Sequence, residues 1–191
     1  EGWKKECGKC PYLQDYPASL YFDFTRFMFN QKKLWFQGFD KLRIVTPSRW
    51  LADRVGQSFL NSKDISVIHN GIDTDEIFYP REINKLIQKH QLENKKIILS
   101  VAPDIMDERK GGEWVLQLAA LFPEEYVFIL VGVKDTNRNF PKNVIALQRT
   151  DNQHQLAEYY SLADLFVICS KRENLPTTCL ESLACGTPVI G

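Results

Sequence analysis

Three short apolar segments in the second half of the chain constrain its fold more than any other feature. They cover residues 95–102, 126–133 and 164–170, and the second is apolar almost throughout. A strand with one face in water alternates apolar and polar side chains, whereas a continuous run of this length is typical of a strand buried on both faces. The three segments therefore predict strands of a parallel sheet that is covered by helices on each side.

Segments with helical spacing separate these strands. Apolar side chains recur on one helical face in residues 112–122 and again in residues 153–163. Shorter strands are expected at residues 143–148 and 189–191. The resulting order, βαββαβαβ, predicts an α/β fold with a mostly parallel sheet.

Two loops, at residues 102–110 and 170–174, leave strands at the edge where the carboxyl ends of the strands lie. Ligands of parallel sheets bind at this edge, so we expect the two loops to converge on one ligand. The second loop leads into a helix whose start is marked by Pro176. Two carboxylates, Glu173 and Glu181, lie eight residues apart around this start.

The predicted helix start suits a nucleotide sugar. Its unpaired backbone N–H groups, those of Thr177, Thr178 and Cys179, and the positive end of the helix dipole favour a diphosphate placed against them. Glu181 lies inside the helix, where its carboxylate can accept hydrogen bonds from ribose hydroxyls. The pattern therefore predicts a nucleotide-sugar site at this junction.

The first eighty residues are organised differently. An aromatic-rich helix is expected at residues 20–36, followed by a strand at 42–46, a helix at 50–60 and a strand at 65–69. The turn residues that begin at Asn70 then break the pattern. We therefore expect a domain boundary near residues 71–81.

Charge and hydropathy exclude some classes of function. The 24 basic and 24 acidic residues cancel, so no broad electrostatic footprint for nucleic acid is expected. No apolar run approaches the roughly 20 residues that span a bilayer, and no targeting segment is recognised at the amino end. We expect a soluble, cytoplasmic protein. Because Glu1 is not a natural start and the last strand begins just before Gly191, we also expect a chain truncated at both ends.

Several segments, in the expected order, carry a family resemblance. They are residues 45–51, residues 67–73 with the following Phe78 and Pro80, the Arg109-Lys110-Gly111-Gly112 segment, the E-x7-E pair of Glu173 and Glu181, and residues 184–189. Together they cover most of the chain from residue 45 onward. In this respect the chain resembles the retaining glycosyltransferases of family 4, also called glycosyl transferases group 1.

The resemblance implies a fold and an activity. The fold is the GT-B type with two Rossmann-like domains, both incomplete here: residues 1–75 would belong to the acceptor-side domain and residues 76–191 to the nucleotide-sugar donor domain. The activity is transfer of a hexosyl-type sugar, with retention of configuration, from a nucleotide-diphosphate sugar to a glycan or lipid-linked acceptor, as in polysaccharide biosynthesis. The donor is a substrate, and the resemblance implies no cofactor and no catalytic metal.

The resemblance also assigns roles to residues that match its motifs. Lys110 and Glu173 would be the catalytic pair: Lys110 contacts the donor diphosphate and offsets the charge of the leaving group, and Glu173 faces the donor sugar. Asn174 and Leu175 would present backbone groups to the sugar, and Glu181 would hold the ribose. The family places a further arginine directly after the strand, where this chain has residues 103–105, Pro-Asp-Ile. Arg109 is the candidate for this second charge.

Other interpretations remain for the same residues. Lys110 could be a solvated lysine at a helix start, Glu173 a surface charge, and Glu181 a carboxylate that stabilises the first turns of the helix. At the level of function, a nucleotide-sugar epimerase of GT-B architecture or a non-catalytic nucleotide-binding fragment would also bind a diphosphate.

Cysteines and aromatic residues outside these motifs leave two more questions. Cys7 and Cys10 form a C-x2-C pair that could serve a zinc site or a disulfide, although the sequence holds no second pair.

An aromatic set lies near several basic residues and comprises Phe22, Phe24, Phe27, Phe29, Trp35 and Phe36. Packing against a domain core is one explanation, and peripheral contact with the inner face of a membrane, for a lipid-linked acceptor, is the other.

Overall fold

A computed structural model describes residues 2–14, 18–19 and 21–191 of the chain. The chain folds as two compact units, Glu1–Asn70 and Gly71–Gly191. The assignment of residues 1–75 to an acceptor-side domain and of residues 76–191 to a donor domain stays a prediction.

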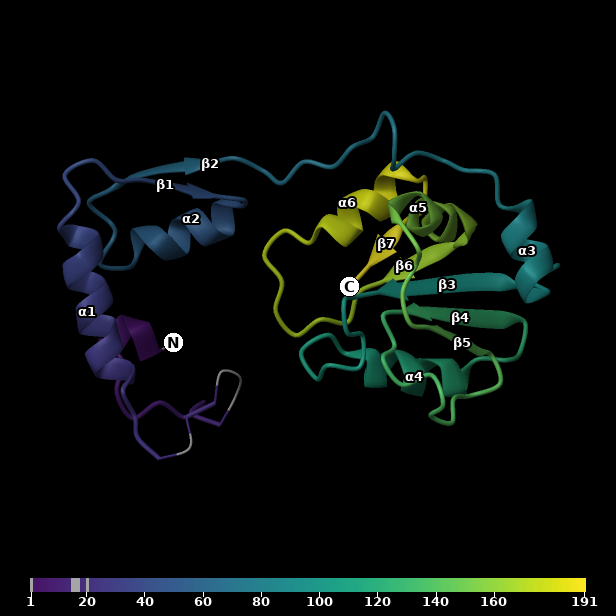
Figure 1. Ribbon diagram of the computed structural model, residues 1–191, viewed down its shortest axis with the longest axis horizontal. Helices are drawn as coiled ribbons and strands as arrows, with labels where there is room; N and C mark the ends of the chain where they lie inside the picture. The colour runs from purple at the N-terminus through teal and green to yellow at the C-terminus, as the bar shows by residue number, and fades with distance from the viewer. Residues whose placement is uncertain (1, 15–17, 20) are drawn as a thin grey trace. The chain divides into compact units, whose positions relative to one another are not determined.

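The carboxyl-terminal unit is built on a sheet in which every strand runs parallel to its neighbours (Figure 1). The strands lie in the order β5-β4-β3-β6-β7, with the first strand of this unit, β3, in the centre. Their bounds are β3 (Lys96–Val101), β4 (Tyr126–Val131), β5 (Val144–Leu147), β6 (Leu165–Val167) and β7 (Val189–Ile190). The structure thus has the parallel sheet that the apolar segments predict, although β6 is shorter than the segment at residues 164–170.

Helices cover both faces of this sheet. Those packed on one face are α3 (Asn84–His90), α5 (Gln153–Leu162) and α6 (Thr177–Ala184), and α4 (Gly112–Leu121) lies on the other face (Figure 1). Alternate residues of β3 enter the two cores: Ile97 and Leu99 pack with α5, whereas Ile98 packs with α4. Because both faces of β3 are buried, the strand needs an unbroken apolar run.

One helix of this unit, α3, has no counterpart in the sequence prediction. Its inward side holds Leu86, which is 5% exposed, with Ile83 and Ile87 packed against the same core. His90 of α3 lies 3.0 Å from the hydroxyl of Tyr159, measured from Nε2. The spacing of Ile83, Leu86, Ile87 and His90 is helical, so the sequence did contain the signal.

The amino-terminal unit contains a pair of parallel strands. They are β1 (Arg43–Thr46) and β2 (Asp64–Val67), with Val45 opposite Ser66. The helices around them are η1 (Gly2–Lys5), α1 (Thr25–Gln37) and α2 (Arg49–Gly56). Ser48 caps α2, since its hydroxyl accepts a hydrogen bond of 3.2 Å from the backbone N–H of Leu51.

The sequence places the start of the aromatic-rich helix too early. It predicts a helix from residue 20, which lies outside the described residues, whereas α1 begins at Thr25. Asp23 explains the later start: one carboxylate oxygen accepts a hydrogen bond from the backbone N–H of Thr25 and the other accepts one from Cys10, both at 2.9 Å. An aspartate bound in this way favours a turn over a helix interior.

Most of the aromatic set around α1 is exposed to solvent. Phe29 is half-buried and packs edge-on against Phe59, with 5.3 Å between ring centroids. The other members are exposed, namely Phe22, Phe24, Phe27, Trp35 and Phe36. Within the described residues, packing therefore covers Phe29 and leaves these five exposed.

Two further findings concern the C-x2-C pair and the helices. Cys7 and Cys10 are free thiols, and the described residues contain no cluster of three or more acidic, histidine or cysteine side chains that could hold a metal. Within the same part of the chain, no helix combines the length and apolar character that crossing a membrane requires.

We expect Gly132→Ala to lower the free energy of unfolding by about 2 kcal/mol or more. Gly132 follows β4 with φ at +100°, and a methyl group there would lie 1.7 Å from the carbonyl oxygen of Ala102, which follows β3. Urea denaturation followed by circular dichroism measures the loss. Gly71→Ala is the matched control, because a Cβ there meets nothing within 4 Å. Equal losses in the two variants would contradict the steric argument.

Candidate functional site

The two loops singled out in the sequence leave neighbouring strands at one point of the sheet. β3 pairs with both β4 and β6. From β3 the chain adds β4 and β5 on one side, and it then adds β6 and β7 on the other side, with all strands still parallel. Such a topological switch point opens a crevice at the carboxyl ends of the strands, where ligands of parallel sheets bind. A buried hydrogen bond of 2.8 Å, from the Ser100 hydroxyl to the carbonyl oxygen of Val167, joins β3 and β6 close to this edge.

Close backbone packing brings the two loops together. Gly111 has φ at +75°, and a Cβ at this position would lie 2.2 Å from the carbonyl oxygen of Cys169. Only glycine fits here, because any other residue would meet the backbone just after β6. The backbone N–H of Lys171 also donates a hydrogen bond of 2.9 Å to the carbonyl oxygen of Arg109. The loop that carries Lys110 is therefore held against the loop that carries Glu173.

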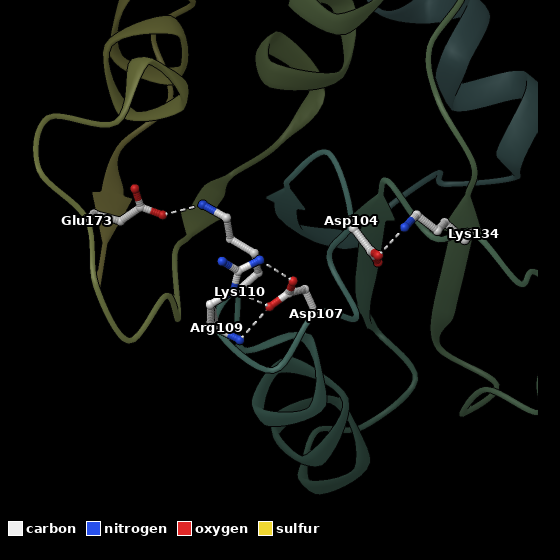
Figure 2. A network of polar contacts seen from close by, with 6 residues as sticks. All are labelled: Asp104, Asp107, Arg109, Lys110, Lys134 and Glu173. Carbon is white, nitrogen blue, oxygen red and sulfur yellow. Dashed lines mark hydrogen bonds and ion pairs between the residues drawn. The ribbon is translucent and has the colours of Figure 1, made fainter. Parts of the chain in front are cut away.

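Lys110 and Glu173 meet across these loops. The Lys110 ammonium donates a hydrogen bond of 2.7 Å to Oε1 of Glu173, and the two side chains are 33% and 28% exposed (Figure 2). Burial raises the pKa of Glu173, but hydrogen bonds from Lys110 and Ser170 and the charge of Lys110 together hold the pKa below its usual value. Glu173 is therefore an ionised carboxylate at neutral pH.

Other ions at this edge also lie in pairs (Figure 2). Arg109 binds Asp107 through two hydrogen bonds of 2.9 and 2.6 Å, which with the Arg109 backbone N–H hold the pKa of Asp107 well below its usual range. Arg109 thus points to its own loop, and its proposed contact with the donor stays a prediction. Asp104 lies in the segment of residues 103–105, where the resemblance would place an arginine, and it pairs with Lys134 at 2.6 Å.

Glu181 lies on the inward side of α6, beside the core. The Tyr160 hydroxyl donates a hydrogen bond of 2.9 Å to its Oε2. Burial raises the pKa of Glu181, and hydrogen bonds from Tyr160 and Thr177 only partly oppose that shift. Tyr160 itself is fully buried, and burial together with the charge of Glu181 raises its pKa strongly.

Tyr160 is a site residue that sequence reasoning did not find. The sequence places it on the apolar face of a helix, which predicts a core residue, and its ring does pack edge-on against Phe166 and Phe78. A buried tyrosine hydroxyl needs a hydrogen-bond partner, and that requirement was the available signal. Here the partner is the carboxylate of Glu181.

Two helices begin at the same edge. Thr177 and Thr178 are the first two residues of α6, and Gly112 is the first residue of α4. No side chain caps either of these two described helix starts. The Cys179 N–H, which the sequence placed among the unpaired donors, donates to the carbonyl oxygen of Pro176, and the Gly112 N–H donates to that of Ile105. The N–H groups of Thr177 and Thr178 and the dipoles of both helices can act on an anion. Pro176 takes the N-cap position, one residue before the helix, and Asn174 and Leu175 complete the loop that starts at Glu173.

A cavity of about 620 Å³ lies elsewhere, on the sheet face that carries α4. Its walls include Leu118 and Phe122 on one side and Leu165 and Ile190 of the sheet on the other. These walls are largely apolar. The charged residues of the lining, Lys96 and Asp164, pair with each other at 3.1 Å at the amino ends of β3 and β6. Ligands of parallel sheets bind at the opposite edge, so we place the candidate site at the Lys110–Glu173 edge instead.

The chain matches a known protein family and is similar to characterised enzymes. Residues 82–191 match the sequence profile of a family described as Glycosyl transferases group 1. The chain is similar to the N-acetyl-alpha-D-glucosaminyl L-malate synthase of Bacillus anthracis, with 26% identity over 168 residues, which make up 81% of this chain and 42% of that enzyme. The chain spans less than half the length of the curated relatives it matches.

Solved structures share the fold. Sucrose-phosphate synthase from Thermosynechococcus elongatus has a TM-score of 0.70 at 24% identity, over 98% of this chain and 47% of that one. HepE from Anabaena, solved in complex with UDP-glucose, has a TM-score of 0.65 at 19% identity, over 88% of this chain and 49% of that one. These likenesses confirm the predicted α/β fold of the GT-B type.

We expect Glu181→Gln to raise the melting temperature at pH 7 by about 1 to 2 °C, a small gain because the half-buried carboxylate is partly screened by solvent. A raised folded-state pKa means that the stability contributed by Glu181 is complete below the unfolded pKa and is lost as the pH rises through the folded pKa. Glutamine cannot ionise and still offers Tyr160 an acceptor.

Calorimetry at pH 7 and pH 4 tests this expectation, because the difference from the wild type should vanish at pH 4. Glu124→Gln, at an exposed position before β4, is the matched control and should change little at either pH. A lower melting temperature for Glu181→Gln at pH 7 would contradict a burial penalty on this carboxylate.

Proposed function

Because the chain belongs to the family of group 1 glycosyl transferases, we propose that its carboxyl-terminal unit binds the nucleotide-diphosphate-sugar donor of a retaining glycosyltransferase. The complete enzyme would transfer the sugar to a glycan or lipid-linked acceptor. The amino-terminal unit would belong to the acceptor-side domain. The HepE complex makes a UDP-sugar the first donor to test.

The observation that carries this proposal is the meeting of Lys110 and Glu173 at the switch point of the sheet. Lys110 supplies a positive charge for the diphosphate, and the backbone N–H groups of Thr177 and Thr178 supply hydrogen bonds at the start of α6. Glu181, further along the same helix, accepts hydrogen bonds from the ribose hydroxyls. The diphosphate, ribose and sugar then each have a partner along one edge.

The chemistry follows from the charge of the leaving group. As the bond between the sugar and the diphosphate breaks, negative charge grows on the departing oxygen, and a cation already in place stabilises that state more than the ground state. Lys110 and the helix starts are such groups, so the proposal assigns no catalytic metal. Glu173 orients the sugar, with backbone groups of Asn174 and Leu175 beside it, and Arg109 would add a second charge by leaving Asp107.

We expect one of the nucleotides UDP, GDP and ADP to stabilise the chain. At about 100 times Kd a ligand adds about 2.7 kcal/mol, which raises the melting temperature by about 5 to 10 °C in a chain of this size. Thermal-shift measurements with wild type, Lys110→Ala and Glu181→Ala should show the gain only in the wild type.

Lys142→Ala is the matched control for the loss of a lysine. Lys142 is exposed and lies just before β5, at the amino edge of the sheet, so its removal should leave the nucleotide effect intact. Absence of stabilisation by all three nucleotides, or equal losses in Lys110→Ala and Lys142→Ala, would contradict the assigned site.

The exposed aromatic set supports a peripheral role at the inner face of a membrane for a lipid-linked acceptor. Phe27, Trp35 and Phe36 lie on α1 together with Lys32 and Lys33, a combination that suits the headgroup region of a bilayer. We expect the chain to sediment with vesicles that contain anionic lipid, and the double variant Phe27→Ser/Trp35→Ser to lose at least half of this binding. Unchanged sedimentation of the double variant would contradict the assignment.

A further inference from the structure

Glu173 and the proposed donor diphosphate would both bind the ammonium group of Lys110. The Glu173 carboxylate lies 2.7 Å from the nitrogen of Lys110, with both side chains about two-thirds covered by the protein. Phosphate oxygens that bind Lys110 would bring a second set of negative charges next to Glu173. Like charges at hydrogen-bond distance repel, so both cannot hold Lys110 at full strength.

We propose that Glu173 competes with the diphosphate for Lys110, and that this exchange lets the site discriminate the nucleotide sugar from the free nucleoside diphosphate. The inference rests on the proposed function. When the sugar is attached, Glu173 leaves Lys110 and accepts hydrogen bonds from sugar hydroxyls, which compensate for the lost ion pair. The free nucleoside diphosphate brings no hydroxyls to that position, so Glu173 keeps opposing it.

The loops that carry Lys110 and Glu173 can keep their positions while the Glu173 side chain changes its partner. Two other contacts join them: the hydrogen bond from the Lys171 backbone N–H to the Arg109 carbonyl oxygen, and an ion pair between Lys171 and Glu108. Neither contact involves the side chain of Lys110 or Glu173. The exchange therefore requires side-chain rotation and no rearrangement of the backbone.

The neighbouring carboxylates of Asp104 and Asp107 are not placed to compete with a diphosphate for Lys110. Asp107 accepts hydrogen bonds from Nε and Nη2 of Arg109, and Asp104 binds Lys134 at 2.6 Å (Figure 2). Glu173 is the carboxylate that lies on Lys110. A direct consequence is that the product of transfer, a nucleoside diphosphate, binds less tightly than the donor and leaves the site more readily.

Titration calorimetry tests the exchange with UDP and UDP-glucose, or with GDP or ADP and the matching glucose conjugate if that base binds. In Glu173→Gln, we expect Kd for the nucleoside diphosphate to fall about tenfold, which corresponds to about 1.4 kcal/mol. Kd for the nucleotide sugar should stay the same or rise, because glutamine replaces a charged partner of the sugar. The preference for the nucleotide sugar should therefore shrink by a factor of about ten or more.

Glu124→Gln is the matched control, because it removes the same charge by the same substitution from an exposed carboxylate before β4 that has no part in the proposed site. It should change each Kd by less than about twofold, since exposed charges are screened by solvent. Equal tightening in Glu124→Gln and Glu173→Gln would overturn the exchange in favour of a general charge effect. An unchanged or weaker affinity of Glu173→Gln for the nucleoside diphosphate would also overturn it.

Two further variants separate this inference from the proposed function. In Lys110→Ala/Glu173→Gln, removal of the carboxylate should give a smaller gain over Lys110→Ala than Glu173→Gln gives over the wild type, because only like-charge repulsion is relieved and no ammonium is released. If Lys110→Ala leaves Kd for the nucleoside diphosphate unchanged, both the assigned site and the exchange are contradicted. Loss of binding in Lys110→Ala, combined with no gain in Glu173→Gln, would overturn only the exchange.

Discussion

The close approach of backbones at the carboxyl edge of the sheet is the constraint on which the rest of the site depends. β3 lies between β4 and β6, and the segments that leave these strands cross each other where a side chain would not fit. Gly132 makes this possible beside β4, and Gly111 makes it possible beside β6. Without these two contacts the loops that carry Lys110 and Glu173 would lie farther apart, whatever their sequence.

Balanced charge is the second property of this edge. Lys110, Arg109 and Lys134 each lie against a carboxylate, so the edge holds several cations without an excess of positive charge. A diphosphate at the proposed site would therefore take a cation from one of these carboxylates. Such an arrangement can be selective, because the carboxylate that is displaced must find a new partner.

Glu181 connects the site to the hydrophobic core. Its partner Tyr160 is buried among aromatic rings, and the hydrogen bond between them fixes one carboxylate oxygen. Holding an ionised carboxylate in this place opposes folding, as the raised pKa of Glu181 indicates. A residue that lowers stability in the free protein and offers acceptors toward the site is typical of a binding position.

The sequence alone determined the strands of the carboxyl-terminal unit, the starts of α4 and α6, and the residue types of the candidate site, because apolar runs and helix-start residues are local signals. Sequence reasoning missed α3, set the start of α1 too early, and did not identify Glu181 as the partner of Tyr160. The tertiary structure alone decided which ions pair at this edge. The pairs are Lys110 with Glu173, Arg109 with Asp107, and Lys134 with Asp104. These contacts join segments up to 63 residues apart or depend on which way a loop turns, and local sequence patterns do not encode either.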